Sequence, residues 1–141
     1  MSGPGLKNAF SHAAIHEAAL NEAIELNELL LQLWKKGDLE KGKEVAYIAV
    51  EHWESRTLKH ADAEESGLYK ELAEEFPQLK SEIIALTRDH DTMRFLVKEL
   101  KELLAKDGFN EEVMARFHAL VHVDQFPIAV VAAAGHAVGH N

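Results

Sequence analysis

The sequence predicts an all-α protein, an up-down-up-down four-helix bundle with a short C-terminal helical tail. Its 141 residues include only eight glycines and three prolines, and this scarcity of helix breakers favours long helices. Apolar residues recur at three- and four-residue steps along four segments, as on amphipathic helices. No segment alternates with the period of a strand, so we expect no β-sheet. A balance of 47% hydrophobic and 28% charged residues suits one domain over residues 1–141.

Glycine, proline and capping residues delimit the expected helices. The segments are Lys7–Lys36, Glu44–Phe76, Gln78–Lys106 and a fourth that follows the N-cap Asn110. Gly37, Pro77 and Gly108 separate them. Pro127 is expected to kink the fourth helix, and the apolar residues 128–138 are expected to form the tail.

Charge and composition restrict the class of partner. Asp and Glu outnumber Lys and Arg by 24 to 15, which argues against a nucleic-acid surface. Cysteine is absent, which excludes disulfides and thiolate metal sites. The N-terminus does not resemble a signal peptide, and no apolar stretch has the length of a membrane span. We therefore expect a soluble, cytoplasmic protein without nucleic-acid or membrane partners, and the sequence leaves its oligomeric state open.

Nine histidines are many for a small acidic chain. Imidazoles occur on each expected helix: His12 and His16 on the first, His60 on the second, His90 on the third, and His118 and His122 on the fourth. Glu64 follows His60 by four residues and therefore shares its helix face. Facing helices that project histidine and carboxylate inward are how bundles build metal sites. We expect His52, His136 and His140 to be surface or boundary residues.

Depth along the bundle can be estimated from the rise of 1.5 Å per residue, counted from the connections. His16, His60, His90 and His122 then fall near one level, whereas His118 lies about two turns away. Imidazole and carboxylate suit iron, manganese and zinc. A buried glutamate is costly unless it is paired or bound to a cation, so the alternative for Glu64 is an ion pair with Arg94.

The order of these motifs resembles the bacterial hemerythrin-like (HHE) domain family. The second expected helix carries His60-Ala-Asp-Ala-Glu64-Glu65-Ser-Gly-Leu68-Tyr69, and Asp89-His90 follows about thirty residues later. The first helix has a histidine followed by apolar residues at helical spacing, from His16 to Leu30. The fourth has His118 and His122 before Phe126-Pro127. The resemblance covers nearly the whole chain, and its second-helix motif is the most specific part.

The resemblance implies a pair of non-haem irons per chain, with Glu64 bridging them. Its implied ligands are His16, His60, Glu64, His90, His118 and, in the sixth place, His122. Three positions depart from the family pattern: Ala61 replaces a frequent second histidine, His122 replaces a bridging carboxylate, and Arg94 stands where hemerythrins offer another histidine. Asp62, Glu65 or Asp124 could then supply the missing negative charge.

Several functions remain open at this point. The resemblance implies a protein that binds or senses dioxygen or another small diatomic ligand, or handles iron or nitric oxide. A non-covalent haem held by two histidines is an alternative, because bis-imidazole ligation needs no carboxylate. A diiron enzyme that reduces peroxide or oxygen is a third hypothesis, and a bundle without metal is a fourth. The sequence has no nucleophile triad and no phosphate-binding glycine loop.

Overall fold

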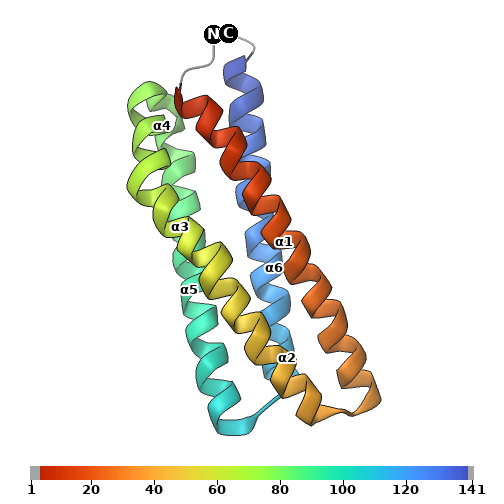
Figure 1. Cartoon of the computed structure of the whole chain (residues 1–141). Helices are drawn as coiled ribbons and strands as arrows, with labels where there is room; N and C mark the ends of the chain where they lie inside the picture. Colours follow the sequence, from red (N-terminus) through yellow and green to blue (C-terminus); the bar gives the residue numbers. More distant parts are fainter. Residues whose placement is uncertain (1–3, 140–141) are drawn as a thin grey trace.

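The computed structural model describes the backbone of residues 4–139 and the side chains of residues 10–125. No β-strand occurs among these described residues, which confirms the predicted all-α class. Four long helical arms lie side by side (Figure 1), an arrangement consistent with a four-helix bundle. The arms are α1 (Pro4–Lys36), a second arm over residues 39–75, α5 (Lys80–Asp107) and α6 (Glu111–Gly139). α1 and α5 each contact both the second arm and α6.

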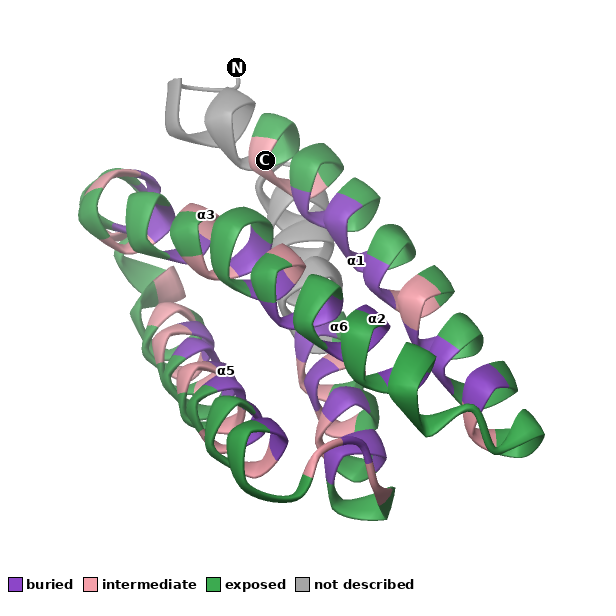
Figure 2. Ribbon diagram, turned by 60° about the horizontal axis from the view of Figure 1, so that its bottom comes forward, coloured by how far each residue is buried: buried purple, intermediate pink, exposed green. Residues whose placement is uncertain are grey.

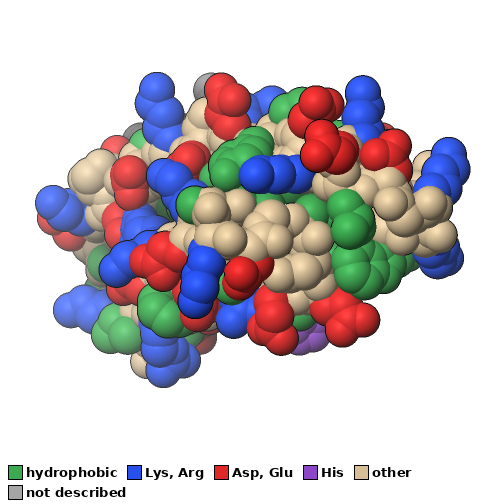
Figure 3. Space-filling model, turned by 90° about the horizontal axis from the view of Figure 1, so that it is seen from below, with side chains coloured by type: hydrophobic (Ala, Val, Ile, Leu, Met, Phe, Trp, Pro, Cys, Tyr) green, Lys and Arg blue, Asp and Glu red, His purple; other side chains and the backbone are tan. Residues whose placement is uncertain are grey.

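The turns between the arms lie where glycine and capping residues predicted them. Gly37 and Gly108 adopt positive φ angles of 73° and 74°, a conformation that glycine reaches without steric cost. Asp38 accepts a hydrogen bond from the Lys41 amide and begins the second arm at Leu39, five residues before the expected Glu44. Figure 3 views the end of the molecule that carries these turns, where acidic and basic side chains are interspersed.

Two further contacts fix this end. Asn110 accepts a hydrogen bond from the Val113 amide, which confirms its predicted role as an N-cap. Gly42 lies within α2, and its backbone packs directly against the Phe109 ring. A Cβ atom at position 42 would overlap that ring.

The second arm is not a uniform α-helix. It consists of α2 (Leu39–His52), the π-helix η1 (Trp53–Leu58), α3 (Lys59–Ala63), the π-helix η2 (Glu64–Leu68) and α4 (Tyr69–Glu75). Buried Trp53, Thr57 and Ala61 follow one another at four-residue steps, each of which would drift by about 40° around an α-helix. The wider π turns absorb this drift and keep the residues on the inner face. π turns within helices often mark functional sites.

A 3₁₀ turn and the two remaining long helices, α5 and α6, complete the chain. After the second arm, the 3₁₀ turn η3 (Pro77–Leu79) leads into α5. α6 continues through Pro127, so the expected C-terminal tail is the end of this helix rather than a separate element. Within the part of the chain that the structure describes, none of the helices combines the length and hydrophobicity that a membrane crossing requires.

Buried residues line the inner sides of the arms (Figure 2), and most of the buried apolar ones belong to one cluster towards the end with the glycine turns. One large cluster draws on all four arms and includes the fully buried Leu30, Trp53, Leu100, Leu104 and Phe117. We call this cluster the apolar half. A smaller cluster of Leu68, Tyr69, Leu72 and Leu86 packs α4 against α5 nearer the other end. Between the two clusters the inner face becomes polar.

Candidate metal centre

Polar side chains from all four arms converge at the level of α3, in the upper half of Figure 1. The set comprises His12 and His16 from α1, His60 from α3, Glu64 and Glu65 from η2, His90 from α5, and Asp124 from α6. We call this set the histidine–carboxylate cluster. Its members include His16, Glu64, His90 and Asp124, which are 7%, 5%, 2% and 0% exposed. Such burial of ionisable groups requires compensating interactions.

Glu64 lies at the centre of the cluster. Its Oε2 atom is 3.8 Å from Nδ1 of His12 and 4.0 Å from Nε2 of His60. Its Oε1 atom is 3.7 Å from Nε2 of His90. The two carboxylate oxygens therefore face different imidazoles. His12, His60 and Glu64 each offer an atom within 4.8 Å of the others, close enough to share one ion.

The first and fourth arms meet through a short contact. Nε2 of His16 donates to Oδ1 of Asp124 over 2.6 Å, and both side chains are buried. Among the described residues, Oδ2 of Asp124 has no hydrogen-bond partner. Asp124 follows Phe117 and Leu120 at seven and four residues, so it continues their buried stripe along α6. An aspartate on that stripe presents an unsatisfied oxygen to the interior.

A second carboxylate orients His90. Nδ1 of His90 donates to Oε2 of Glu65 over 2.7 Å, which leaves the Nε2 lone pair directed towards Glu64. Arg94 donates to the same Glu65 oxygen over 2.9 Å. The Tyr69 ring stacks on His90 with ring centroids 5.8 Å apart.

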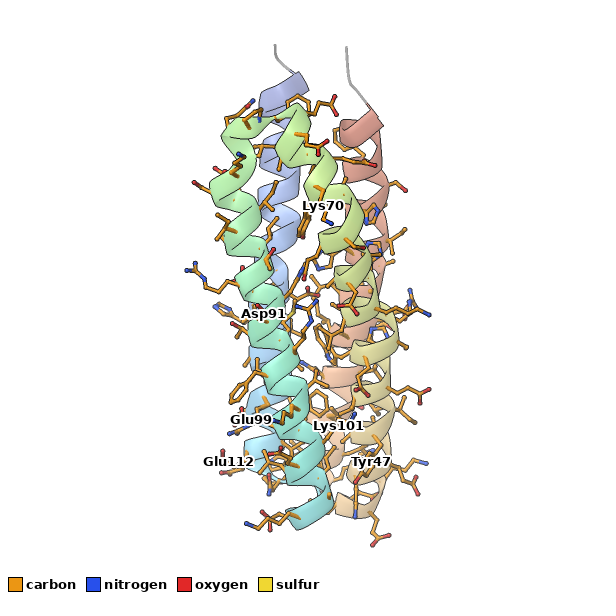
Figure 4. All side chains as sticks on the ribbon, turned by 90° about the vertical axis from the view of Figure 1, so that its left-hand side faces the viewer. Tyr47, Lys70, Asp91, Glu99, Lys101 and Glu112 are labelled. Atoms are coloured by element: carbon orange, nitrogen blue, oxygen red, sulfur yellow. The ribbon has the colours of Figure 1, made fainter. Side chains whose placement is uncertain are left out.

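Arg94, the alternative partner of Glu64, forms its ion pairs with other carboxylates. Arg94 pairs with Asp62, Glu65 and Asp91, at 2.7, 2.9 and 2.7 Å. Figure 4 shows Asp91 on α5, with Glu99 and Lys101 further towards the glycine turns. The alternative of a Glu64–Arg94 ion pair is therefore not realised, because Glu64 faces inward while Arg94 binds the carboxylates around the rim.

Burial and neighbouring charges shift the proton affinities in the cluster. Burial raises the pKa of Glu64 to about 7. Burial, together with the nearby imidazoles, lowers the pKa of His60 to about 4. Burial also lowers the pKa of His90 despite its bond to Glu65. For His16, burial is outweighed by the hydrogen bond and charge of Asp124, which raise its pKa. His60 and His90 thus favour the neutral form, the form that binds cations.

The structure brings together four of the six predicted ligands and separates the other two. His16, His60, Glu64 and His90 lie in the cluster. His118 and His122 are exposed on α6, which contradicts their expected projection into the core. His118 lies over a groove between α1 and α6, beside Val121. The physical reason is angular: matching depth along a bundle says nothing about which face of the helix a residue occupies.

The spacing of the buried residues on α6 identifies the ligand-type residue that faces the interior, which depth along the bundle did not. Val113, Phe117 and Leu120 recur at four and three residues, and the next position on that face is Asp124, not His118 or His122. His12 lies one turn before His16 on α1, on the same face of that helix, and it also belongs to the cluster.

The remaining histidines lie elsewhere. His52 donates to the Ala19 carbonyl over 2.9 Å and lies 3.5 Å from Glu22, outside the cluster as predicted. His136 and His140 fall outside the residues whose side chains the structure describes.

A small cavity opens beside the cluster, between α1 and η1. Its volume is about 10 Å³, which suits one water-sized molecule. The walls include the ligand-type residues His16, His60, Glu64, His90 and Asp124, together with Ile15, Ala19, Arg56 and Thr57. The cluster therefore borders a space that a small molecule could occupy.

The donor set fits a hard or borderline cation. Imidazole nitrogens and carboxylate oxygens converge, and the chain has no thiolate. The lone pair of His90 Nε2 faces a Glu64 oxygen, and Asp124 Oδ2 lacks a donor among the described residues. A cation between these groups would resolve both conflicts, because it accepts electron pairs from each.

Comparison with known proteins agrees with this chemistry. The family model of the hemerythrin HHE cation-binding domain matches residues 13–125, which hold every member of the cluster except His12. The comparisons with curated proteins and with solved structures found no match.

Proposed function

The chain belongs to the hemerythrin HHE cation-binding domain family, and we propose that its histidine–carboxylate cluster holds two non-haem iron ions that bind a small diatomic ligand such as dioxygen. The family match confirms the resemblance that the sequence motifs indicated. The up-down-up-down order of the arms belongs to the same proposal and is supported by their short connections. That order would place one face of each arm at the iron pair.

The geometry of Glu64 carries the proposal. One of its oxygens faces His12 and His60, and the other faces His90. A carboxylate with imidazoles on both sides can bridge two cations, one through each oxygen. We therefore assign His12, His60 and Glu64 to one ion. We assign Glu64, His90, His16 and Asp124 to the other.

This ligand set balances charge better than the one implied by the motifs alone. The proposed set contains His12 and Asp124 in place of His118 and His122, and therefore has four imidazoles and two carboxylates. Glu65 adds a third carboxylate behind His90. Negative groups close to the ions lower the cost of burying cations in a dry interior. The hydrogen bond from His90 to Glu65 also holds that ring in the orientation that an ion needs.

Iron bound in such a set supplies reversible redox chemistry and coordination sites for small diatomic molecules. The protein's own contribution is to orient the ligands and restrict water. Arg94 holds Glu65 in place beneath His90 through a hydrogen bond of 2.9 Å. The carboxylates of Glu64 and Asp124 among the imidazoles favour iron ions over the haem alternative, because bis-imidazole ligation of haem needs no carboxylate.

Metal analysis of the full chain tests the proposal. The protein is reconstituted anaerobically with ferrous iron, desalted and analysed for iron per chain, and its optical spectrum is recorded after exposure to air. We expect two irons per chain and weak near-ultraviolet bands. An iron-free protein would overturn the proposal, and an intense Soret band in the purified protein would replace it with the haem hypothesis.

Matched histidine variants locate the ions. His60→Ala removes an imidazole that faces Glu64, so we expect it to lose at least one iron per chain. His118→Ala changes the same residue type on the exposed face of α6 and should retain full iron content. Loss of iron in His118→Ala, with retention in His60→Ala, would show that the exposed histidines are the ligands.

A further inference from the structure

Two exposed apolar side chains lie beside a groove on the outer side of α1 and α2. These helices are neighbours joined by the turn at Gly37 (Figure 1). Leu29 of α1 and Ile48 of α2 are 41% and 57% exposed, and both line the groove, whose volume is about 450 Å³. Single apolar residues on a surface need no explanation, whereas large ones that share a groove indicate a contact with a partner. We call the groove and the exposed residues along its two helices the α1–α2 face.

The two apolar residues lie near one level of the bundle. Leu29 comes eight residues before Gly37, which is about 12 Å of helix. Ile48 comes ten residues after Asp38, which is about 15 Å of helix. The difference is less than one helical turn, so a line through both residues runs across the two helices rather than along them.

Lysine side chains lie on this face at the end with the glycine turns. Lys36 follows Leu29 by seven residues, almost two turns, and therefore shares its side of α1. Lys41 precedes Ile48 by seven residues and shares its side of α2 in the same way. Both lysines are exposed. Glu44 lies 4.0 Å from Lys41, whereas Lys36 has no ion-pair partner among the side chains of residues 10–125. This end of the face is therefore basic.

Carboxylates lie on the same face beyond the apolar residues. Glu25 lies one turn from the apolar residue of α1, and Glu51 lies one turn from that of α2. Both are exposed, and neither forms an ion pair within the described part of the chain. Glu22 also lines the groove, but Arg56 binds it over 3.0 Å. The α1–α2 face thus has a basic end, an apolar middle and an acidic end.

Such a face is complementary to a second copy of itself. A two-fold axis along the line through Leu29 and Ile48 would lay each helix antiparallel to its own copy. Each apolar residue would then meet its counterpart, and the basic end of one chain would face the acidic end of the other. A two-fold axis parallel to the helices would instead bring lysine against lysine and glutamate against glutamate. The charges therefore favour one of the two arrangements.

We propose that the chain forms an antiparallel, two-fold symmetric dimer through the α1–α2 face. In this dimer Lys36 faces the partner's Glu25, and Lys41 faces the partner's Glu51. Apolar contact across the groove drives the association, and the charges set its direction. The dimer goes beyond the proposed function, because its contacts use no member of the histidine–carboxylate cluster. Its test therefore gives an answer whether or not the cluster holds iron.

Single-cysteine variants test where the two chains meet. The chain has no cysteine, so an introduced one can form a disulfide only with the same position of another chain. Ile48→Cys lies on the proposed axis, and we expect mild oxidation to convert it to a disulfide-linked dimer on a non-reducing gel. Phe95→Cys is the matched control, because Phe95 is 59% exposed but lies on α5. It should remain mostly monomeric on the gel.

Charge reversal tests the antiparallel direction. Glu25→Lys combined with Glu51→Lys makes both ends of the face basic, and turns the four attractive contacts of the dimer into repulsive ones. We expect the dimer Kd, measured by sedimentation, to rise about tenfold or more. Lys36→Glu combined with Lys41→Glu makes both ends acidic and should act equally. A mixture of the two double variants should regain a dimer with one chain of each, because unlike ends then face each other. Circular dichroism and the thermal midpoint verify the fold of every variant.

The outcomes separate the dimer from the metal centre. A wild-type chain that stays monomeric at about 1 mM would overturn the inference. Equal cross-linking of Phe95→Cys and Ile48→Cys would also overturn it, because the chains would then meet without preference for the α1–α2 face. Folded charge-reversed variants that dimerise as the wild type does would refute the antiparallel pairing. A dimer that holds no iron would count against the proposed function alone.

Discussion

The two halves of the bundle interior obey different energetics although the same four arms build both. In the apolar half, side chains such as Leu30, Leu100 and Phe117 are fully buried among other hydrocarbons, and each contributes stability by leaving water. In the histidine–carboxylate cluster, Glu64 and Asp124 are buried just as deeply, and their burial opposes folding until something neutralises them. One half of the core stabilises the scaffold, and the other half uses that stability to hold reactive groups in place.

Among single substitutions, we expect the largest loss of stability from one in the apolar half. Phe117→Ala leaves a cavity at a fully buried site, and we expect the free energy of unfolding to fall by about 3–5 kcal/mol. Urea denaturation of the metal-free protein measures it. Phe95→Ala is the control, because Phe95 is 59% exposed and its loss should cost far less. Equal losses in the two variants would contradict the division between a packed core and a solvated face.

Iron bound at the histidine–carboxylate cluster should stabilise the folded chain. Ions that bind only the folded chain stabilise it by mass action, by about 3 kcal/mol per site at a hundredfold excess over the Kd. We expect the thermal midpoint to rise with iron and to return after chelation. Glu64→Gln should lose most of this rise, because its amide bridges cations poorly. An equal rise in wild type and Glu64→Gln would mean that the iron binds outside the cluster.

The pH dependence of the metal-free protein sharpens the comparison. Glu64 has its pKa raised from 4.5 to about 7, so it stabilises the fold below pH 4.5, and this contribution is lost as the pH rises through 7. His60 has its pKa lowered from 6.5 to about 4, so it stabilises the fold above pH 6.5, and this contribution is lost as the pH falls through 4. The two effects oppose each other across the window between pH 4.5 and 6.5.

Glu64→Gln separates these contributions. Without the carboxyl, the free energy of unfolding should rise more steeply between pH 4.5 and 7 than it does in the wild type, by no more than about 3 kcal/mol over the window. Urea denaturation at several pH values measures both profiles. Parallel profiles would show that Glu64 titrates at its ordinary pKa and is not buried in the metal-free protein.

The smallest effect concerns Tyr69, at the border of the cluster. Its ring stacks on His90, but its buried hydroxyl has no hydrogen-bond partner among the described residues. Tyr69→Phe should therefore leave the metal-free protein unchanged or more stable by less than about 1 kcal/mol. Tyr47→Phe is the matched control, because Tyr47 lies on the outside of α2 (Figure 4) and is 44% exposed. Clear destabilisation of Tyr69→Phe alone would reveal a partner for the hydroxyl.

The sequence determined the helices and most of the chemistry of this protein. The spacing of apolar residues predicted four helical segments, and Gly37, Gly108 and Asn110 fixed where the chain turns, because backbone conformation and capping are local properties. The His60–Glu64 pair also needed nothing beyond helical periodicity, since residues four apart share a face. The family resemblance of these motifs agrees with the match over residues 13–125.

Only the tertiary structure decided which groups meet across the bundle. Depth along a helix placed His122 at the level of the cluster, but the rotation of α6 turned it outward and brought in Asp124. The π turns of the second arm were not visible in the periodicity either. Local spacing fixes the angle between residues of one helix, whereas the angle at which that helix faces its neighbours is set by the packing of its whole apolar stripe.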